Sequence, residues 1–175
     1  LALGQPRRIW SSIMINKKYM RILFILYLLI LLKVIIFKYP FTVMQQIADS
    51  WSKEVFWEGL SGANFELFRT IKLYIRHWDN KAINSFGNLI GNIVAFIPLG
   101  YMMPRLHKIF ENLFICMATA LLFVFGIDLF QLFSAFSIFD VDDILLNGLG
   151  AFAGYLCFVL MKGIHKRIEK KKEKL

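Results

Sequence analysis

Four long apolar runs, separated by polar segments, dominate the pattern of hydrophobic positions along this chain. The third run is nearly pure hydrocarbon until Asp128, whereas polar residues interrupt the other three more often. An α-helix that crosses a bilayer needs roughly 20 predominantly apolar residues. The pattern therefore predicts an all-α membrane protein, a bundle of about four transmembrane helices, over residues 22–37, 84–103, 113–133 and 140–161.

The first run contains Lys33, and Lys38 and Tyr39 follow it at a position that suits a membrane interface. A cleaved signal peptide is the rival interpretation, but the next residues, KYPFTVMQQ, offer no small-residue cleavage site. We therefore expect a retained helix. Residues 1–13 show no clear pattern, and they are either a remnant preceding a native start at Met14 or a short tail. The expected organisation is an N-terminal tail, a transmembrane domain and a basic tail, over 1–18, 19–161 and 162–175.

The segment 41–85 is the longest polar connection, and its charges are balanced. Apolar residues recur at helical spacing in its second half, with basic residues on the other side; they are Phe65, Phe68, Ile71, Ile75 and Trp78. This spacing predicts an amphipathic helix in the outer connection. Two placements stay open, one on the membrane surface and one in a soluble cap that packs on its own helices.

Composition supports a membrane protein and narrows its partners. Of the 175 residues, 58% are hydrophobic, and the mean hydropathy is +0.57, which is too apolar for an ordinary soluble domain of this size. The net charge is +9, but Lys and Arg lie at the chain ends and between apolar runs. We therefore expect membrane lipids with anionic headgroups, and no nucleic acid, as partners of this charge. Cys116 and Cys157 lie inside apolar runs and predict neither a disulfide nor a zinc site.

Basic residues also predict how the helices are oriented. The N-terminal flank, the 104–112 turn and the C-terminal tail are basic, whereas the 134–143 corner is acidic. Because cytoplasmic loops carry an excess of Lys and Arg, we expect a multi-pass protein with both termini in the cytoplasm. The 134–143 corner then lies on the outer side.

Polar residues of the second run share one face of its predicted helix. Asn84, Asn88 and Asn92 are spaced by four, and hydrogen bonds between helices would explain them without any ligand. Gly87 and Gly91 form a small-xxx-small pair, which predicts the close approach of another helix.

The end of the third run and the start of the fourth carry acidic and amide residues. Asp128 and Gln131 share a face at i, i+3. Carboxylates within a membrane usually face a protein interior or a wet cavity, because exposure to lipid is costly. Asp140, Asp143 and Asn147 form one stripe in the fourth run, although an N-cap role alone would also explain Asp140.

Two further features of the fourth run follow from the same periodicity. Asp142 points away from the stripe and is expected to face water. Gly150 and Gly154 lie on the side of Asn147, where they could admit a neighbouring backbone.

Together these side chains predict an outer-facing polar pocket between three helices. Its amides and carboxylates suit a polyol, an amide, a peptide or a hard cation with oxygen ligands. Asp140 and Asp143 are candidate metal ligands, but short Asp clusters are common, and neither a metal nor another cofactor is predicted. Asp128 is the candidate catalytic base if the protein is an enzyme. The predicted ligand-binding site consists of Asn88, Asn92, Asp128, Gln131, Asp140, Asp143 and Asn147.

Three motifs follow one another between residues 64 and 155. They are N-F-x-L-F-R-T-I from Asn64, N-x-x-x-N-x-x-x-F-x-P-x-G-x-x-x-P from Asn88, and D-x-x-Q…F-D-x-D-D-x-x-x-N-x-x-G-x-x-x-G from Asp128. In this order and spacing the chain resembles the VanZ-like family of bacterial membrane proteins, whose best-known member is associated with resistance to the glycopeptide antibiotic teicoplanin. The family usually has Glu in place of Asp128, so this chain keeps the charge on a shorter side chain. It usually has Arg in place of Ser137, and without that cation an anion-binding role is not carried over.

The resemblance implies an antibiotic-resistance protein of the bacterial cell membrane. The leading hypothesis is a non-enzymatic protein that lowers susceptibility to teicoplanin-type glycopeptides by binding the antibiotic or a lipid-linked cell-wall precursor in the polar pocket. One alternative is a membrane enzyme that modifies a lipid or cell-wall intermediate. The other is a small proton-coupled transporter or assembly subunit, in which Asp128 carries protons and the glycines form the seam of a homo-oligomer.

Overall fold

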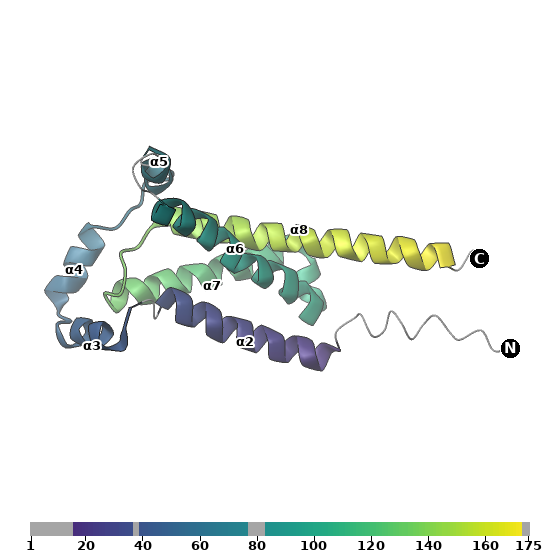
Figure 1. The fold of residues 1–175 in the computed structure, drawn as a ribbon, viewed down its shortest axis with the longest axis horizontal. Helices are drawn as coiled ribbons and strands as arrows, with labels where there is room; N and C mark the ends of the chain where they lie inside the picture. The colour runs from purple at the N-terminus through teal and green to yellow at the C-terminus, as the bar shows by residue number, and fades with distance from the viewer. Residues whose placement is uncertain (1–15, 37–38, 77–82, 173–175) are drawn as a thin grey trace.

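The computed structural model is a bundle of long helices with shorter helices at one end (Figure 1). It describes residues 16–36, 39–76 and 83–172. Four helices are long and apolar enough to cross a membrane. They are α2 (Lys17–Ile36), α6 (Ile83–Leu106), α7 (Leu113–Phe133) and α8 (Val141–Lys172). The described residues form no strand, so the predicted all-α bundle with four membrane-length helices is confirmed.

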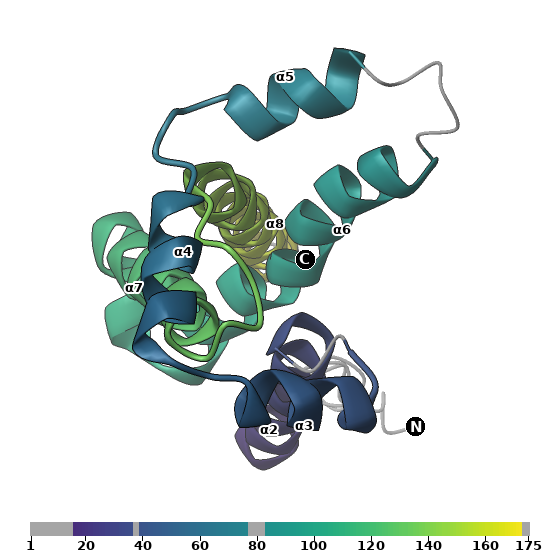
Figure 2. The ribbon, with the colours of Figure 1, turned by 90° about the vertical axis from the view of Figure 1, so that its left-hand side faces the viewer.

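Short helices distinguish the two ends of the bundle. One end, here the loop end, carries α3 (Phe41–Asp49), α4 (Lys53–Ser61), α5 (Arg69–Arg76) and the 134–140 turn (Figures 1 and 2). The opposite end, here the terminal end, holds the start of α2, the end of α8 and the 3-10 helix η1 (Lys108–Glu111). With 32 residues α8 is about 48 Å long, so its last turns extend beyond the other helices (Figure 1).

The amphipathic helix predicted in the 41–85 connection is shorter than expected. Because α5 begins at Arg69, Phe65 and Phe68 precede it, and Trp78 lies outside the described residues. Phe68 has a φ of 67°, in the left-handed region, which a right-handed helix cannot accommodate. The preceding part of the connection forms α3 and α4, and the side chain of Ser52 caps α4 by accepting a hydrogen bond from the Val55 amide at 3.3 Å.

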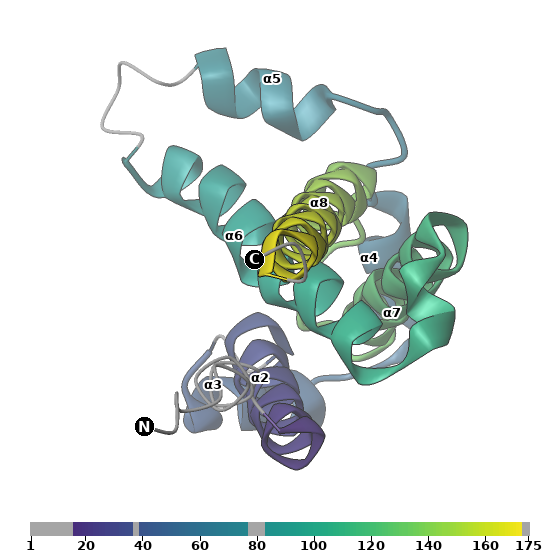
Figure 3. The same ribbon diagram turned by 90° about the vertical axis from the view of Figure 1, so that its right-hand side faces the viewer.

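Helices α6 and α8 form the closest pair in the bundle, and Figure 3 shows them side by side when viewed from the terminal end. Glycines bring the two backbones together. A Cβ added to Gly100 would lie 1.8 Å from the Ala151 carbonyl oxygen, and a Cβ on Gly154 would lie 1.9 Å from that of Ile97. The expectation that Gly150 and Gly154 admit a neighbouring backbone is therefore confirmed.

The glycine pair predicted to mediate close packing on α6 is the wrong one. No described atom outside the local helix lies within 4 Å of a Cβ placed on Gly87 or Gly91. These two glycines lie in the first half of α6, where it diverges from α8 (Figure 2). The close approach occurs further along α6, at Gly100, because that part of α6 runs against the α8 glycines.

The apolar core lies between α6, α7 and α8. Phe96, Cys116, Ala120, Val124 and Ala151 are completely buried there. Large apolar side chains on the outer faces of the long helices are exposed, as expected where lipid replaces water.

Helix α2 is fastened to this core by two side-chain hydrogen bonds. The Tyr27 hydroxyl donates to the Ala95 carbonyl of α6 at 2.8 Å. Gln131 of α7 donates through Nε2 to the Ile35 carbonyl of α2 at 2.9 Å. In a membrane interior, where apolar contact between helices competes with apolar contact to lipid, such bonds help to fix a peripheral helix.

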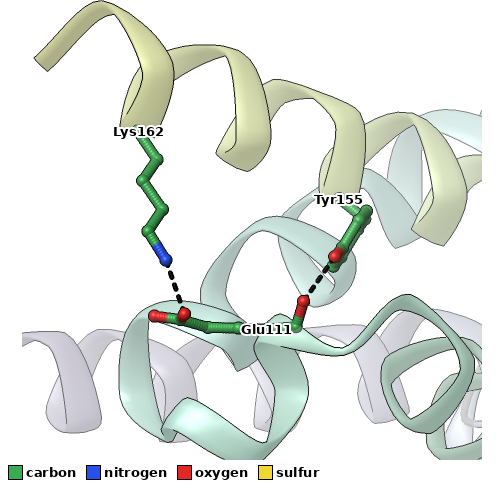
Figure 4. A network of polar contacts seen from close by, with 3 residues as sticks. All are labelled: Glu111, Tyr155 and Lys162. Atoms are coloured by element: carbon green, nitrogen blue, oxygen red, sulfur yellow. Dashed lines mark hydrogen bonds and ion pairs between the residues drawn. The ribbon is translucent and has the colours of Figure 1, made fainter. Parts of the chain in front are cut away.

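The terminal end is fixed by a polar network around η1 (Figure 4). The Tyr155 hydroxyl donates to the backbone carbonyl of Glu111 at 2.5 Å. Lys162 Nζ lies 2.5 Å from Glu111 Oε2 and donates a hydrogen bond to it. This bond is the main reason that the pKa of Glu111 lies below its ordinary value. The network ties η1 to α8 where both leave the bundle.

We expect Glu111→Gln to lower stability slightly at neutral pH and to have no effect in strong acid. The lowered pKa means that the ion pair stabilises the fold above the ordinary carboxyl range, and that this contribution disappears as the pH falls through the lowered pKa. The effect is small because both side chains are more than one-third exposed. Thermal midpoints of both proteins across this range would test it, with the exposed Glu58→Gln as control.

Candidate functional site

Asp140 occupies the N-cap position of α8 and joins it to the segment 64–71. Its Oδ1 accepts hydrogen bonds from the Asp142 amide at 2.9 Å and from Asn64 Nδ2 at 2.8 Å. Its Oδ2 accepts one from the Thr70 hydroxyl at 2.5 Å. Both carboxylate oxygens are thus engaged by protein donors, so the N-cap explanation accounts for Asp140 without a ligand.

Asn64 holds the same junction through its backbone. Its amide donates to the Phe139 carbonyl at 2.8 Å, and its carbonyl accepts from the Val141 amide at 3.0 Å. Its side-chain oxygen accepts from the Glu66 amide at 3.1 Å. Asn64 is 7% exposed, so these bonds satisfy polar groups that water reaches poorly.

Asp142 does not face water, contrary to the prediction. The residue is completely buried, and its carboxylate accepts hydrogen bonds from three backbone amides, those of Phe68 at 2.6 Å, Thr70 at 2.8 Å and Ile71 at 3.2 Å. The Thr70 and Ile71 amides belong to the first turn of α5, and Phe68 immediately precedes that turn, where a negative charge is favoured. The helical periodicity placed Asp142 correctly away from the bundle interior, but the 64–71 segment folds over that side.

We call these residues the α5 clamp: Asn64, Thr70, Asp140 and Asp142. Sequence reasoning gave no role to Asn64 or Thr70, although both lie in the first of the three motifs. The sequence could have suggested this role, because polar side chains in the first motif and in the Asp cluster can form hydrogen bonds with each other. The α5 clamp thus assigns a structural role to the first and third motifs.

A second group, here the acid–amide cluster, consists of Asn92, Asp128, Asp143 and Asn147. Asn92 of α6 donates through Nδ2 to Asp143 Oδ1 of α8 at 2.8 Å. Asp128 of α7 lies within electrostatic reach of Asp143 and, more weakly, of Asp140. Asn147 lies one helical turn after Asp143 on the same side of α8. Three membrane-length helices therefore contribute to this cluster.

Two members of the acid–amide cluster each have one buried oxygen without a hydrogen-bond partner in the described part of the chain. Asp128 is 5% exposed and Asn147 is 6% exposed, and neither Asp128 Oδ2 nor Asn147 Oδ1 has a hydrogen-bond donor among the described residues. Buried polar atoms are nearly always hydrogen-bonded, so these two oxygens call for an explanation.

Three of the predicted site residues lie outside the acid–amide cluster. Gln131 bonds to α2, Asp140 belongs to the α5 clamp, and Asn88 is exposed on α6. The described residues contain no group of three or more His, Cys, Asp or Glu side chains that could hold a metal ion. Ser137, at the position where members of the VanZ-like family usually have Arg, lies in the turn between α7 and α8.

Four helices that are long and apolar enough to cross a membrane, with acidic and amide groups between three of them, are typical of a membrane protein with a polar cluster inside its helix bundle. The family model VanZ/LLP1 matches residues 24–162, which is more than half of the chain. The chain belongs to this family. The comparison with curated proteins gave no match, and neither did the comparison with solved structures.

Proposed function

We propose that this protein lowers the susceptibility of a bacterium to teicoplanin-type glycopeptide antibiotics. It does so by binding the antibiotic or a lipid-linked cell-wall precursor at the loop end. The observation that carries the proposal is the Asn92–Asp143 hydrogen bond, which joins α6 and α8 near that end with both residues only half-buried. Membership of the VanZ/LLP1 family supports it.

Exposed aromatic side chains at the loop end support a ligand with an apolar part. Phe41, Trp51, Trp57 and Phe65 are 78%, 47%, 63% and 66% exposed. Such side chains present a broad apolar surface at low entropic cost, and Trp and Tyr favour the membrane interface. Both proposed ligands would approach this surface from the outer leaflet.

Trp51 and helix α4, which carries Trp57, are anchored to the bundle. Trp51 donates through Nε1 to the Phe133 carbonyl at the end of α7 at 2.8 Å. The Phe56 ring stacks on the Phe133 ring, with centroids 5.2 Å apart and an interplanar angle of 11°. This part of the aromatic surface is therefore held in position, which limits the entropy lost when a ligand binds.

The proposal places the loop end outside the cell and both termini in the cytoplasm of a bacterial membrane. Its support is the position of the basic residues. Figure 1 shows the start of α2 and the end of α8 at the same end of the bundle, and Lys17, Lys18, Lys166 and Arg167 are exposed there. Cytoplasmic segments carry such an excess of basic residues.

Expression of the chain in a teicoplanin-sensitive bacterium should raise the minimal inhibitory concentration of teicoplanin above that of the empty vector. Asp143→Asn should weaken ligand binding by about 10- to 100-fold, because a hydrogen bond to a charged group contributes about 1.5–3 kcal/mol. This loss should return susceptibility towards the vector value.

Asp49→Asn is the matched control, because Asp49 is an exposed acid at the end of α3. It should protect as well as the unaltered chain does. Membrane levels of all three proteins would be compared by immunoblot. An unaltered chain that reaches the membrane and leaves susceptibility at the vector value would refute the resistance function.

A further inference from the structure

Two buried oxygens in the acid–amide cluster accept no hydrogen bond from the described residues. They are Asp128 Oδ2 on α7 and Asn147 Oδ1 on α8, and both residues are more than nine-tenths buried. Leaving a buried acceptor unpaired costs about 1–3 kcal/mol, and more if the group is charged. Both atoms are acceptors, so a group that donates, or a positive charge, would satisfy them.

The charges around Asp128 have the same sign as its own. Asp143 on α8 and Asp140 at the N-cap of α8 are the charged groups that act on it. The only charged side chain of α6 is Arg105, in its last turn at the opposite end. Helix α4, which packs on the end of α7, carries Lys53, Glu54 and Glu58, and all three are exposed. Lys33 of α2 and the α5 cations Arg69, Lys72 and Arg76 are also exposed. None of the described cations therefore balances a carboxylate at Asp128.

We propose that Asp128 binds a small monovalent cation, either a proton or Na⁺, with Asn147 as a second oxygen acceptor one turn deeper than Asp143. The deep burial of both residues excludes a large ligand from these oxygens. A proton would turn Asp128 into a hydrogen-bond donor, and Na⁺ would take both oxygens as hard ligands. The inference goes beyond the proposed function, because it concerns the buried pair and not the half-buried Asn92–Asp143 pair.

Cation binding predicts that the folded protein is stabilised by acid, by Na⁺ or by both. The cation binds acceptors that are buried and unpaired only in the folded chain, so it raises the thermal midpoint by mass action. Once the cation is above its dissociation constant, each tenfold increase should raise the midpoint by about 3–6 °C. The unaltered protein in detergent would be measured over a pH series in choline chloride, and then over a NaCl series at high pH with choline replacing Na⁺.

Asp128→Asn should abolish the response that is specific to this site, because the amide has nearly the same shape but carries no negative charge and takes up no proton in this pH range. Asp128→Glu should keep the response, and Asp49→Asn should leave it unchanged. A response to pH alone identifies the proton, whereas a response to NaCl identifies Na⁺. The proposal fails if the unaltered protein and Asp128→Asn respond identically to both series, or if the unaltered protein responds to neither.

Infrared difference spectra provide a test that does not require Asp128→Asn to fold. If the cation is a proton, acidification should produce the C=O stretch of a protonated carboxyl, and Asp128→Glu should shift that band. If the cation is Na⁺, adding NaCl at high pH should change the carboxylate stretches, and Asp128→Glu should alter that change. Spectra of the two proteins that are the same under both treatments would overturn the assignment to Asp128. None of these measurements depends on antibiotic susceptibility.

Discussion

We expect Gly154→Ala to destabilise the bundle by about 3 kcal/mol or more, at the upper end of the cost of overpacking a core. The new Cβ would lie 1.9 Å from the Ile97 carbonyl oxygen and 2.9 Å from the Tyr101 amide nitrogen. These are backbone atoms, so no side chain can rotate away, and α6 and α8 must separate. The thermal midpoint in detergent should fall by about 6–12 °C.

Gly91→Ala on α6 is the matched control for this substitution. A Cβ at Gly91 meets no described atom outside the local helix within 4 Å, so the change adds no clash. Alanine also stabilises a helix interior by about 0.5–1 kcal/mol relative to glycine, so the midpoint should stay or rise. Equal midpoints for Gly154→Ala and Gly91→Ala would contradict the close α6–α8 contact.

Hydropathy predicted the existence of the four long helices and the limits of α7, because the third apolar run ends where that helix ends. It predicted the limits of the others less well, since it detects apolar residues and not helices. Helix α2 begins at Lys17, five residues before its apolar run, and α8 continues through the basic tail to Lys172. Lys, Arg and Glu are good helix formers, so a helix continues past the apolar part of its sequence.

The arrangement of polar residues was only partly predictable from helical periodicity. The stripe of Asp143 and Asn147 follows from periodicity alone, and Asn92 meets Asp143 because α6 and α8 pack together. The role of Asp142 depends on how the 64–71 segment folds. The left-handed conformation of Phe68 and the backbone bonds of Asn64 define that fold, and neither follows a regular repeat that a sequence pattern could reveal.

The α5 clamp predicts that Asp142→Ala will release the start of α5. The substitution removes the acceptor of three backbone amides, those of Phe68, Thr70 and Ile71, at a completely buried position. Each buried amide left unpaired costs about 1–3 kcal/mol, so the local cost is about 3 kcal/mol even after partial rehydration. Amide hydrogen exchange over residues 66–76 should therefore accelerate strongly, while exchange in α7 changes little.

Limited digestion with trypsin would report the same event, because α5 contains Arg69, Lys72 and Arg76. Cleavage at these residues should be faster in Asp142→Ala, and Asp49→Ala, which removes an exposed acid on α3, should not change it. Asp142→Asn should accelerate cleavage less than Asp142→Ala does, because its oxygen can still accept from the Thr70 and Ile71 amides, whereas its amide nitrogen cannot accept from the Phe68 amide. Cleavage should be faster even when no antibiotic or lipid precursor is present. This result would show that Asp142 holds α5 in place and does not act by binding a ligand. Unchanged cleavage in Asp142→Ala would mean that α5 is held by contacts other than the clamp.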